Sequence, residues 1–339
     1  MITGIIAVII FLSILILVHE LGHFLTAKKF GLLVEEFGLG LPPRIWGKKI
    51  GETIYSVNAL PFGGFVKIYG EEADAVSGGL RDFRNLFVWK RSVIIFAGVV
   101  MNFLLGWLVI SLVFSIGIPQ AVMITDVRSD SPAATAGLAP NDKVVGFQKA
   151  DEFVKYIDQN RGKEITLKIE RLDKTLDIKT TPRVNPPAGE GALGIGLVEA
   201  GLPKQGILKS FIEGFKTSIG IIQAIFLALF NLISQVFVGK AGLEQVTGPV
   251  GIVKITAQAG SLGFIYLLQL LALISLNLAV INIFPFPALD GGRLLFLLIE
   301  KIKGSPLPVK FERYVNTAGM ALLLLLMAAI TIKDIGRFF

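Results

Sequence analysis

Apolar residues in this chain are gathered into long continuous blocks instead of recurring on one face, as they do in a helix at the surface of a soluble protein. The first block begins at residue 2 and extends to residue 27, and the others lie at 92–116, 216–238, 262–286 and 317–332. A helix needs about 20 consecutive apolar residues to cross the hydrocarbon of a bilayer. The pattern therefore predicts an α-helical polytopic membrane protein.

Two long polar segments lie between the first three blocks. Residues 34–70 contain short β-prone sequences punctuated by Gly and Pro, which predicts hairpins. Residues 118–210 are charged and rich in turn residues, and strands are expected at 164–170 and 174–180. The second segment therefore predicts an inserted soluble α+β domain.

Composition supports a membrane protein and limits the chemistry. Of the 339 residues, 53% are apolar and 17% are charged, whereas soluble domains usually carry about 25% charged residues. No cysteine is present, so disulfides, thiolate ligands and a thiol nucleophile are excluded, and any metal must be held by His, Asp or Glu. The net charge is +7, but the basic residues flank apolar blocks. This arrangement favours membrane lipid over nucleic acid as the partner.

The distribution of Lys and Arg predicts the orientation. Ten basic residues lie within 28–91 and none precedes the first block, so we expect this segment inside and the inserted domain outside the cell. Basic residues within 293–313 place that loop in the cytoplasm, which requires an odd number of crossings after residue 210. We therefore interpret 216–238, with Gln223 and Asn231 near one helical face, as a helix on the membrane surface. Four transmembrane helices are predicted.

These predictions divide the chain into four parts. The first contains two transmembrane helices and a β-rich loop, the second is the inserted domain, the third is a helical linker at the membrane surface, and the fourth contains two further transmembrane helices. Their expected boundaries are 1–116, 117–205, 206–260 and 261–339.

The two histidines of the chain lie four residues apart with a glutamate between them, in His19-Glu20-Leu21-Gly22-His23. On a helix, positions i and i+4 share a face, so both imidazoles can reach one zinc ion while Glu20 lies beside it as a general base. The alternative is a helix end with two interfacial histidines. Counted at about 1.5 Å per residue, His19 lies roughly 26 Å along a hydrocarbon core about 30 Å thick, near its cytoplasmic face. Ionisable residues at such depth normally mark a functional site, so we favour the metal site.

Two histidines leave a catalytic zinc ion one protein ligand short. With no cysteine and no third histidine, a carboxylate must supply it. Asp290 is the best candidate by topology, because it follows the block at 262–286 and lies at the same cytoplasmic depth as the histidines. Pro285 and Pro287 break the helix before it, and broken helix at membrane depth is tolerated where it lines a cavity or packs on protein. The alternative is a loop aspartate that caps the next helix.

The histidine motif, the element N-x-x-P-x-P-x-L-D-G that begins at Asn282, and the inserted domain together resemble the site-2 protease family of intramembrane zinc metalloproteases, of the bacterial regulator of sigma-E protease type. The resemblance covers nearly the whole chain. It implies that Asp290 is the third zinc ligand and that Asn282, with Pro285 and Pro287 of the same element, contacts the substrate.

The resemblance extends to a segment of the second apolar block. Asn102, in Phe96-Ala97-Gly98-Val99-Val100-Met101-Asn102-Phe103, maps to a family asparagine implied to orient the substrate. Here Val99 stands where the family commonly has proline. The alternative role for Asn102 is a hydrogen bond between helices.

The polar segments are also similar to family elements. Residues 34–70 resemble membrane re-entrant β-elements, whose edge strand can pair with an unwound substrate; the alternative is an ordinary cytoplasmic loop. Residues 121–145 resemble the beginning of a circularly permuted PDZ domain, with Asn141 in place of the usual glycine. The segment 191–196 is expected to form the edge that a peptide could join. Whether this single domain binds a peptide or acts as a steric filter stays open.

Three functions compete. The resemblance implies an intramembrane zinc endopeptidase of a bacterial plasma (inner) membrane, which acts in regulated intramembrane proteolysis on single-span membrane proteins such as trimmed anti-sigma factors or signal-peptide remnants. The alternative is a non-catalytic PDZ-bearing adaptor, which would have no use for Glu20. A transporter is disfavoured, because the chain has too few spans and no inverted repeat of the site.

Overall fold

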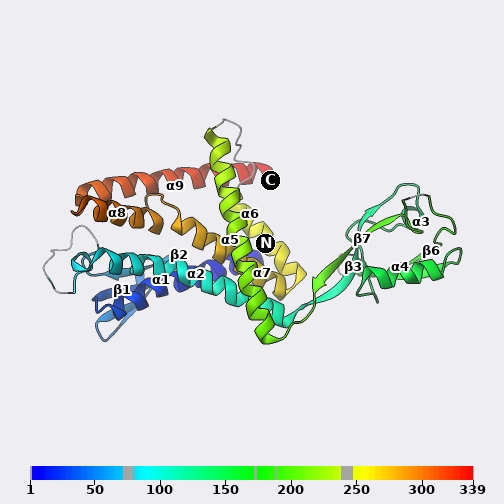
Figure 1. Cartoon of the computed structure of the whole chain (residues 1–339), viewed down its shortest axis with the longest axis horizontal. Coiled ribbons are helices and arrows are strands. Elements are labelled where there is room, and N and C mark those ends of the chain that lie inside the picture. Colours follow the sequence, from blue (N-terminus) through cyan, green and yellow to red (C-terminus); the bar gives the residue numbers. More distant parts are fainter. Residues whose placement is uncertain are drawn as a thin grey trace. The chain divides into compact units, whose positions relative to one another are not determined.

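The computed structural model describes residues 2–71, 79, 81–171, 174–187, 189–237 and 247–338. They form two compact units, one of residues 1–112 and 211–339 and the other of residues 113–210 (Figure 1). The second unit overlaps the insert predicted at 117–205. Residues 238–246, which belong to the predicted linker at 206–260, lie outside the described residues.

Long apolar helices make up most of the first unit. Five described helices are long and apolar enough to cross a membrane, namely α1 (Ile2–Lys29), α2 (Val88–Ile116), α5 (Ile207–Phe237), α7 (Phe264–Ile283) and α9 (Val309–Phe338). α5 contains the block that the charge pattern assigns to the membrane surface, yet it satisfies the same length and hydropathy criteria as the other four. The chain is a multi-pass membrane protein, and the number of four spans stays a prediction.

Glycine at two positions lets α1 and α2 approach closely. A Cβ atom on Gly22 of α1 would lie 2.4 Å from the carbonyl oxygen of Ala97, and a Cβ atom on Gly98 of α2 would lie 2.5 Å from His23 Nε2. Both distances are far below van der Waals contact, so there is no space for a side chain at either position. This close approach brings α2 against the imidazoles of α1.

Residues 284–289 connect α7 to α8 (Asp290–Lys303) and interrupt the helix at the two prolines. Ala288 has a φ of 74°, and its N–H donates to Asn316 Oδ1 of α9 at 3.1 Å. A Cβ atom on Gly291 would lie 2.2 Å from a carbonyl oxygen of this connection, so the chain turns back tightly on itself. α8 begins directly after this turn, so Asp290 is its first residue.

A short helix is tied to the end of α9. α6 (Pro249–Leu262) begins after Gly248, which supplies no side-chain cap. The buried carboxylate of Asp334 supplies the cap instead, because its Oδ2 accepts from the backbone N–H groups of Gly248 and Gly251, each at 2.9 Å.

A long hairpin follows α1 and is formed by β1 (Val34–Ile50) and β2 (Thr53–Ile68). Residues 44–50 pair with 53–58 near the turn, and residues 34–39 pair with 64–68 at the base. Residues 36–39 pair with 54–57 as well, so this part of β1 has a β2 segment on each side. The base is joined to α1, α2 and α8 by a buried apolar cluster, which includes Phe83 of the short 3-10 helix η1 (Phe83–Asn85): Ala27, Leu32, Val34, Ile68, Phe83, Ile94, Ile95 and Leu297. The structure therefore contains β-elements where the sequence predicts hairpins.

Among its described residues, the second unit contains a five-stranded sheet and two short helices, besides the ends of α2 and α5. Its elements are β3 (Ile118–Val127), α3 (Pro132–Thr135), β4 (Lys143–Val144), α4 (Ala150–Gln159), β5 (Ile165–Arg171), β6 (Lys174–Thr180) and β7 (Ile195–Leu202), with the strand order β6-β5-β4-β3-β7. β5 and β6 lie within one residue of the strands expected from sequence. The edge strand expected at 191–196 begins only at Ile195, and residues 191–194 precede it as a turn.

A buried carboxylate fixes the turn into β4. Asn141 has a φ of 71°, the left-handed conformation in which glycine or asparagine is favoured. The Asp142 side chain is 1% exposed and accepts from Arg171 Nε and Nη2, both at 2.6 Å, and from the Ala139 N–H at 2.8 Å. Burial alone would raise the pKa of Asp142, but these hydrogen bonds lower it below its ordinary value. The stability that Asp142 contributes is therefore present at neutral pH and is lost as the pH falls through this lowered pKa.

We expect Asp142→Ala to destabilise the second unit by about 1–3 kcal/mol, because Arg171 and the Ala139 N–H lose their buried acceptor. Hydrogen exchange of the full-length protein would measure this as faster exchange in β4 and β5. Asp158→Ala is the matched control, since Asp158 forms an exposed pair with Arg161 whose loss should cost under about 1 kcal/mol. Equal exchange in the two variants would contradict the role of Asp142.

Candidate metal centre

The helical spacing of the two histidines brings their rings together on α1. His19 and His23 lie on one face, and their Nε2 atoms are 3.2 Å apart. Nδ1 of His23 lies 2.9 Å from the carbonyl oxygen of Ile94, and because a carbonyl oxygen only accepts, Nδ1 is the donor. The proton of His23 is therefore on Nδ1, and the lone pair of Nε2 faces His19.

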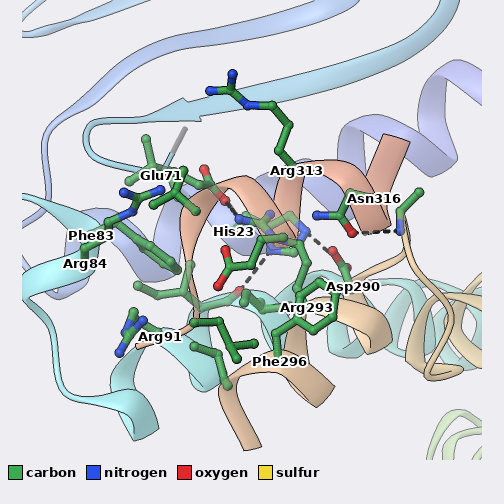
Figure 2. A pocket seen from close by; sticks show the side chains of 18 of the residues that line it. His23, Glu71, Phe83, Arg84, Arg91, Asp290, Arg293, Phe296, Arg313 and Asn316 are labelled. Atoms are coloured by element: carbon green, nitrogen blue, oxygen red, sulfur yellow. Dashed lines mark hydrogen bonds and ion pairs between the residues drawn. The ribbon is translucent and has the colours of Figure 1, made fainter. Parts of the chain in front are cut away.

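Asp290 reaches this pair from the beginning of α8. Its Oδ2 atom lies 3.1 Å from His19 Nε2 and 3.4 Å from His23 Nε2 (Figure 2). The same Oδ2 is buried and receives no hydrogen bond. A buried carboxylate oxygen without a donor is costly, and a cation bound between the three side chains would remove that cost.

The spacing of the three atoms fits zinc. Nitrogen and oxygen ligands bind zinc at about 2.0–2.1 Å in a tetrahedron, which sets neighbouring ligand atoms roughly 3.4 Å apart. The three observed separations are 3.1, 3.2 and 3.4 Å. Within the described part of the chain, these side chains form a group of His, Cys, Asp or Glu residues able to hold one metal ion. Three protein ligands leave a fourth position open, as in catalytic zinc sites.

A cavity of about 1330 Å³ opens beside these ligands (Figure 2). It is lined by the three ligands and by charged, polar and apolar side chains from α1, β2, α2, α8 and α9. Glu20 lines it, and so do Phe65 and Val66 of β2. The general base predicted from the sequence and one strand of the hairpin therefore face the same space as the histidines and the carboxylate.

α8 lines the cavity and is held in place by two ion pairs. Arg293 pairs with Glu71, which follows β2, and Arg91 of α2 contacts both carboxylate oxygens of Glu300, with Nη1 3.0 Å from Oε2. The side chains of Arg91 and Glu300 are 10% and 12% exposed. Because α8 begins with Asp290, these pairs fix the element that carries the carboxylate ligand.

The structure brings together some of the residues singled out from the sequence and separates others. His19, Glu20, His23 and Asp290 line one cavity. Asn102 contacts Nδ1 of His19 and does not line the cavity. Asn282 lies in the last turn of α7, and neither it nor the two prolines of the following connection, Pro285 and Pro287, line the cavity.

Several residues of the site carry no signal in the sequence. Arg91 and Glu300 are 209 positions apart, and Arg293 and Glu71 are 222 apart. No local pattern links such pairs. Gly98 belongs to a segment quoted above for its resemblance, but its contact with the imidazoles becomes visible only once α1 and α2 are packed together.

We expect Gly98→Ala to weaken zinc binding by about 10-fold or more, the effect typical of disturbing the partners of a ligating histidine. The added Cβ would lie 2.5 Å from His23 Nε2 and 2.7 Å from His19 Cε1, so the rings must move. Competition with a zinc chelator would measure the affinity of the full-length protein. The control is Gly220→Ala on α5, where a Cβ meets nothing within 4 Å. Equal affinities would refute this packing constraint.

Comparison with known proteins agrees with this chemistry. Residues 7–326 match peptidase family M50. The chain is 37% identical, over 95% of its length and 96% of the relative, to a Clostridium perfringens protein whose name assigns it provisionally to the zinc metalloproteases. It is 30% identical to the regulator of sigma-W protease RasP of Bacillus subtilis and 29% identical to the zinc metalloprotease RasP of Shouchella clausii, over at least 98% of each chain. The chain therefore belongs to peptidase family M50 and is a zinc metalloprotease.

Proposed function

We propose that His19, His23 and Asp290 hold the catalytic zinc ion, that Glu20 is the general base, and that the enzyme cleaves single-span membrane proteins within the membrane. One observation carries the assignment: the three ligand atoms lie 3.1–3.4 Å apart, and Glu20 lines the cavity that they face. A pure binding protein would have no use for a carboxylate at position 20, which disfavours the adaptor.

The residues divide the chemistry between them. A bound zinc ion supplies Lewis acidity, which lowers the pKa of water and polarises a carbonyl group. Glu20 accepts the proton of the attacking water and later donates it to the leaving amide nitrogen, so that the cleaved bond yields a carboxylate and an amine. The ion pairs that fix α8 keep Asp290 in place while this proton moves.

The substrate must be extended before it can react, because a transmembrane helix hides its peptide bonds in hydrogen bonds. β2 offers a place for an extended segment. Phe65 pairs with Gly38 and Val66 with Phe37, and both Phe65 and Val66 line the cavity. Pairing of an unwound substrate segment along β2 would hold a peptide bond beside the metal ligands. Asn282, Pro285 and Pro287 are assigned to substrate binding by resemblance alone.

The wider role follows from topology and from the relatives. The basic loops favour an orientation with the metal ligands near the cytoplasmic face and the second unit, proposed to be PDZ-like, outside the cytoplasm. The family resemblance and the bacterial relatives favour a bacterial plasma (inner) membrane. A relative named regulator of sigma-W protease supports a role in regulated intramembrane proteolysis, with anti-sigma factors or signal-peptide remnants as the substrate class. The second unit is proposed to act there as a filter or a peptide binder.

The decisive test is Glu20→Gln, examined with a tagged single-span reporter. Loss of the general base should reduce cleavage about 10²- to 10⁴-fold and leave zinc bound. Glu213→Gln is the matched control, because Glu213 lies on α5 and pairs with the exposed Lys216. Cleavage of the reporter at the same rate by wild type and Glu20→Gln would exclude the catalytic assignment.

Asp290→Ala should lower the zinc content of the purified protein well below one ion per chain, because two imidazoles alone make an incomplete site. Metal analysis after dialysis would measure it. Asp151→Ala, at an exposed position in the first turn of α4, should retain full zinc. Full zinc occupancy in Asp290→Ala would remove Asp290 from the set of ligands.

A further inference from the structure

Asn102 is completely buried in the middle of α2. Its side chain is 0% exposed, and its amide lies 3.2 Å from Nδ1 of His19. It is not among the residues that line the cavity. The substrate-orienting role that the family resemblance implies for Asn102 stays a prediction, and its contact with His19 gives the residue a second candidate role.

Chemistry decides which end of the amide faces His19. A histidine that binds a metal through Nε2 carries its remaining proton on Nδ1, and that N–H needs an acceptor. The amide nitrogen of Asn102 is a donor only, whereas its Oδ1 is an acceptor, and an amide can exchange the two by a half turn. With the nitrogen toward His19, Oδ1 is buried without a partner. The half turn gives Oδ1 the Nδ1–H of His19.

The backbone of Asn102 is also held. Ser275 of α7 donates its hydroxyl to the carbonyl oxygen of Asn102 at 2.7 Å, and both residues are fully buried. One turn further along α2, a Cβ on Gly106 would lie 2.7 Å from the side chain of Leu276, so the two helices pack closely here. The backbone that carries the Asn102 side chain is therefore held by the contact between α2 and α7.

We propose that Asn102 is a positioning residue for the metal centre: its side-chain oxygen accepts the Nδ1–H of His19 and so directs the Nε2 lone pair of His19 at the metal. The proposal rests on the proposed role of His19 as a ligand. Ile94 does the same for His23 through its carbonyl oxygen. Both acceptors belong to α2, so one helix orients both imidazoles of α1. Partners of this kind fix the tautomer and the ring orientation of ligating histidines.

The test measures zinc affinity of the full-length protein in detergent by competition with a chromogenic chelator. Asn102→Leu has similar volume and no acceptor, and we expect it to bind zinc about 10- to 100-fold more weakly than wild type. Asn102→Asp keeps an acceptor oxygen and should recover affinity to within a few-fold. Asn102→Ala adds no bulk and gives the same test should the leucine variant not fold.

Asn277→Leu is the matched control, because the Asn277 amide donates only to the Leu273 carbonyl of its own helix, α7, in the described contacts. It should bind zinc as wild type does. At saturating zinc, Asn102→Ala should cleave the single-span reporter with an unchanged KM.

Two outcomes would overturn the proposal. One is wild-type zinc affinity in Asn102→Leu or Asn102→Ala together with a raised KM, which would return Asn102 to substrate binding. The other is an Asn102→Asp variant that binds zinc no better than Asn102→Leu. A wild-type protein that binds no zinc would instead refute the metal assignment itself, so the two failures are distinguishable.

Discussion

Three atoms that carry lone pairs converge between α1 and α8, and their mutual repulsion is the constraint that the surrounding structure has to satisfy. Two imidazole nitrogens and one carboxylate oxygen lie within 3.4 Å of each other in a largely buried place. Such atoms do not attract one another unless a cation or a proton lies between them. The arrangement is therefore imposed from outside, by helix spacing on α1, by the hydrogen-bond acceptors on α2, and by the ion pairs that fix α8.

The elements around the ligands are packed closely, as such a constraint requires. Gly22 and Gly98 leave no gap between α1 and α2, and the turn before Asp290 is folded tightly against the end of α7. Two ion pairs, Arg91 with Glu300 and Arg293 with Glu71, also hold α8. The side chains of the Arg91–Glu300 pair are largely buried. A catalytic metal site needs ligands held in place before the metal arrives, since each movable ligand adds an ordering cost to binding.

How much of this could be predicted depends on the range of each interaction. The pairing of His19 with His23 is set by four residues of helix, so the sequence alone predicts it, and the strands β5 and β6 follow from local alternation in the same way. Topology predicts Asp290, because the orientation of the helices limits which carboxylates share a depth. The contacts of Asn102 and Gly98 cannot be predicted in this way, because they exist only between packed helices. The apolar block within α5 shows another limit of local sequence. Its polar face favours a helix on the membrane surface, whereas its length and hydropathy favour a membrane-spanning helix, and local sequence does not decide between the two.

The position of Asp290 at the very start of α8 has an electrostatic consequence. Leu289 offers no side-chain cap, and the positive end of the helix macrodipole lies beside this carboxylate. That field favours the anionic form by about 0.3–1 kcal/mol, with or without a cation nearby. The start of α8 thus contributes to metal binding twice, through the side chain of Asp290 and through the helix dipole that favours its charge.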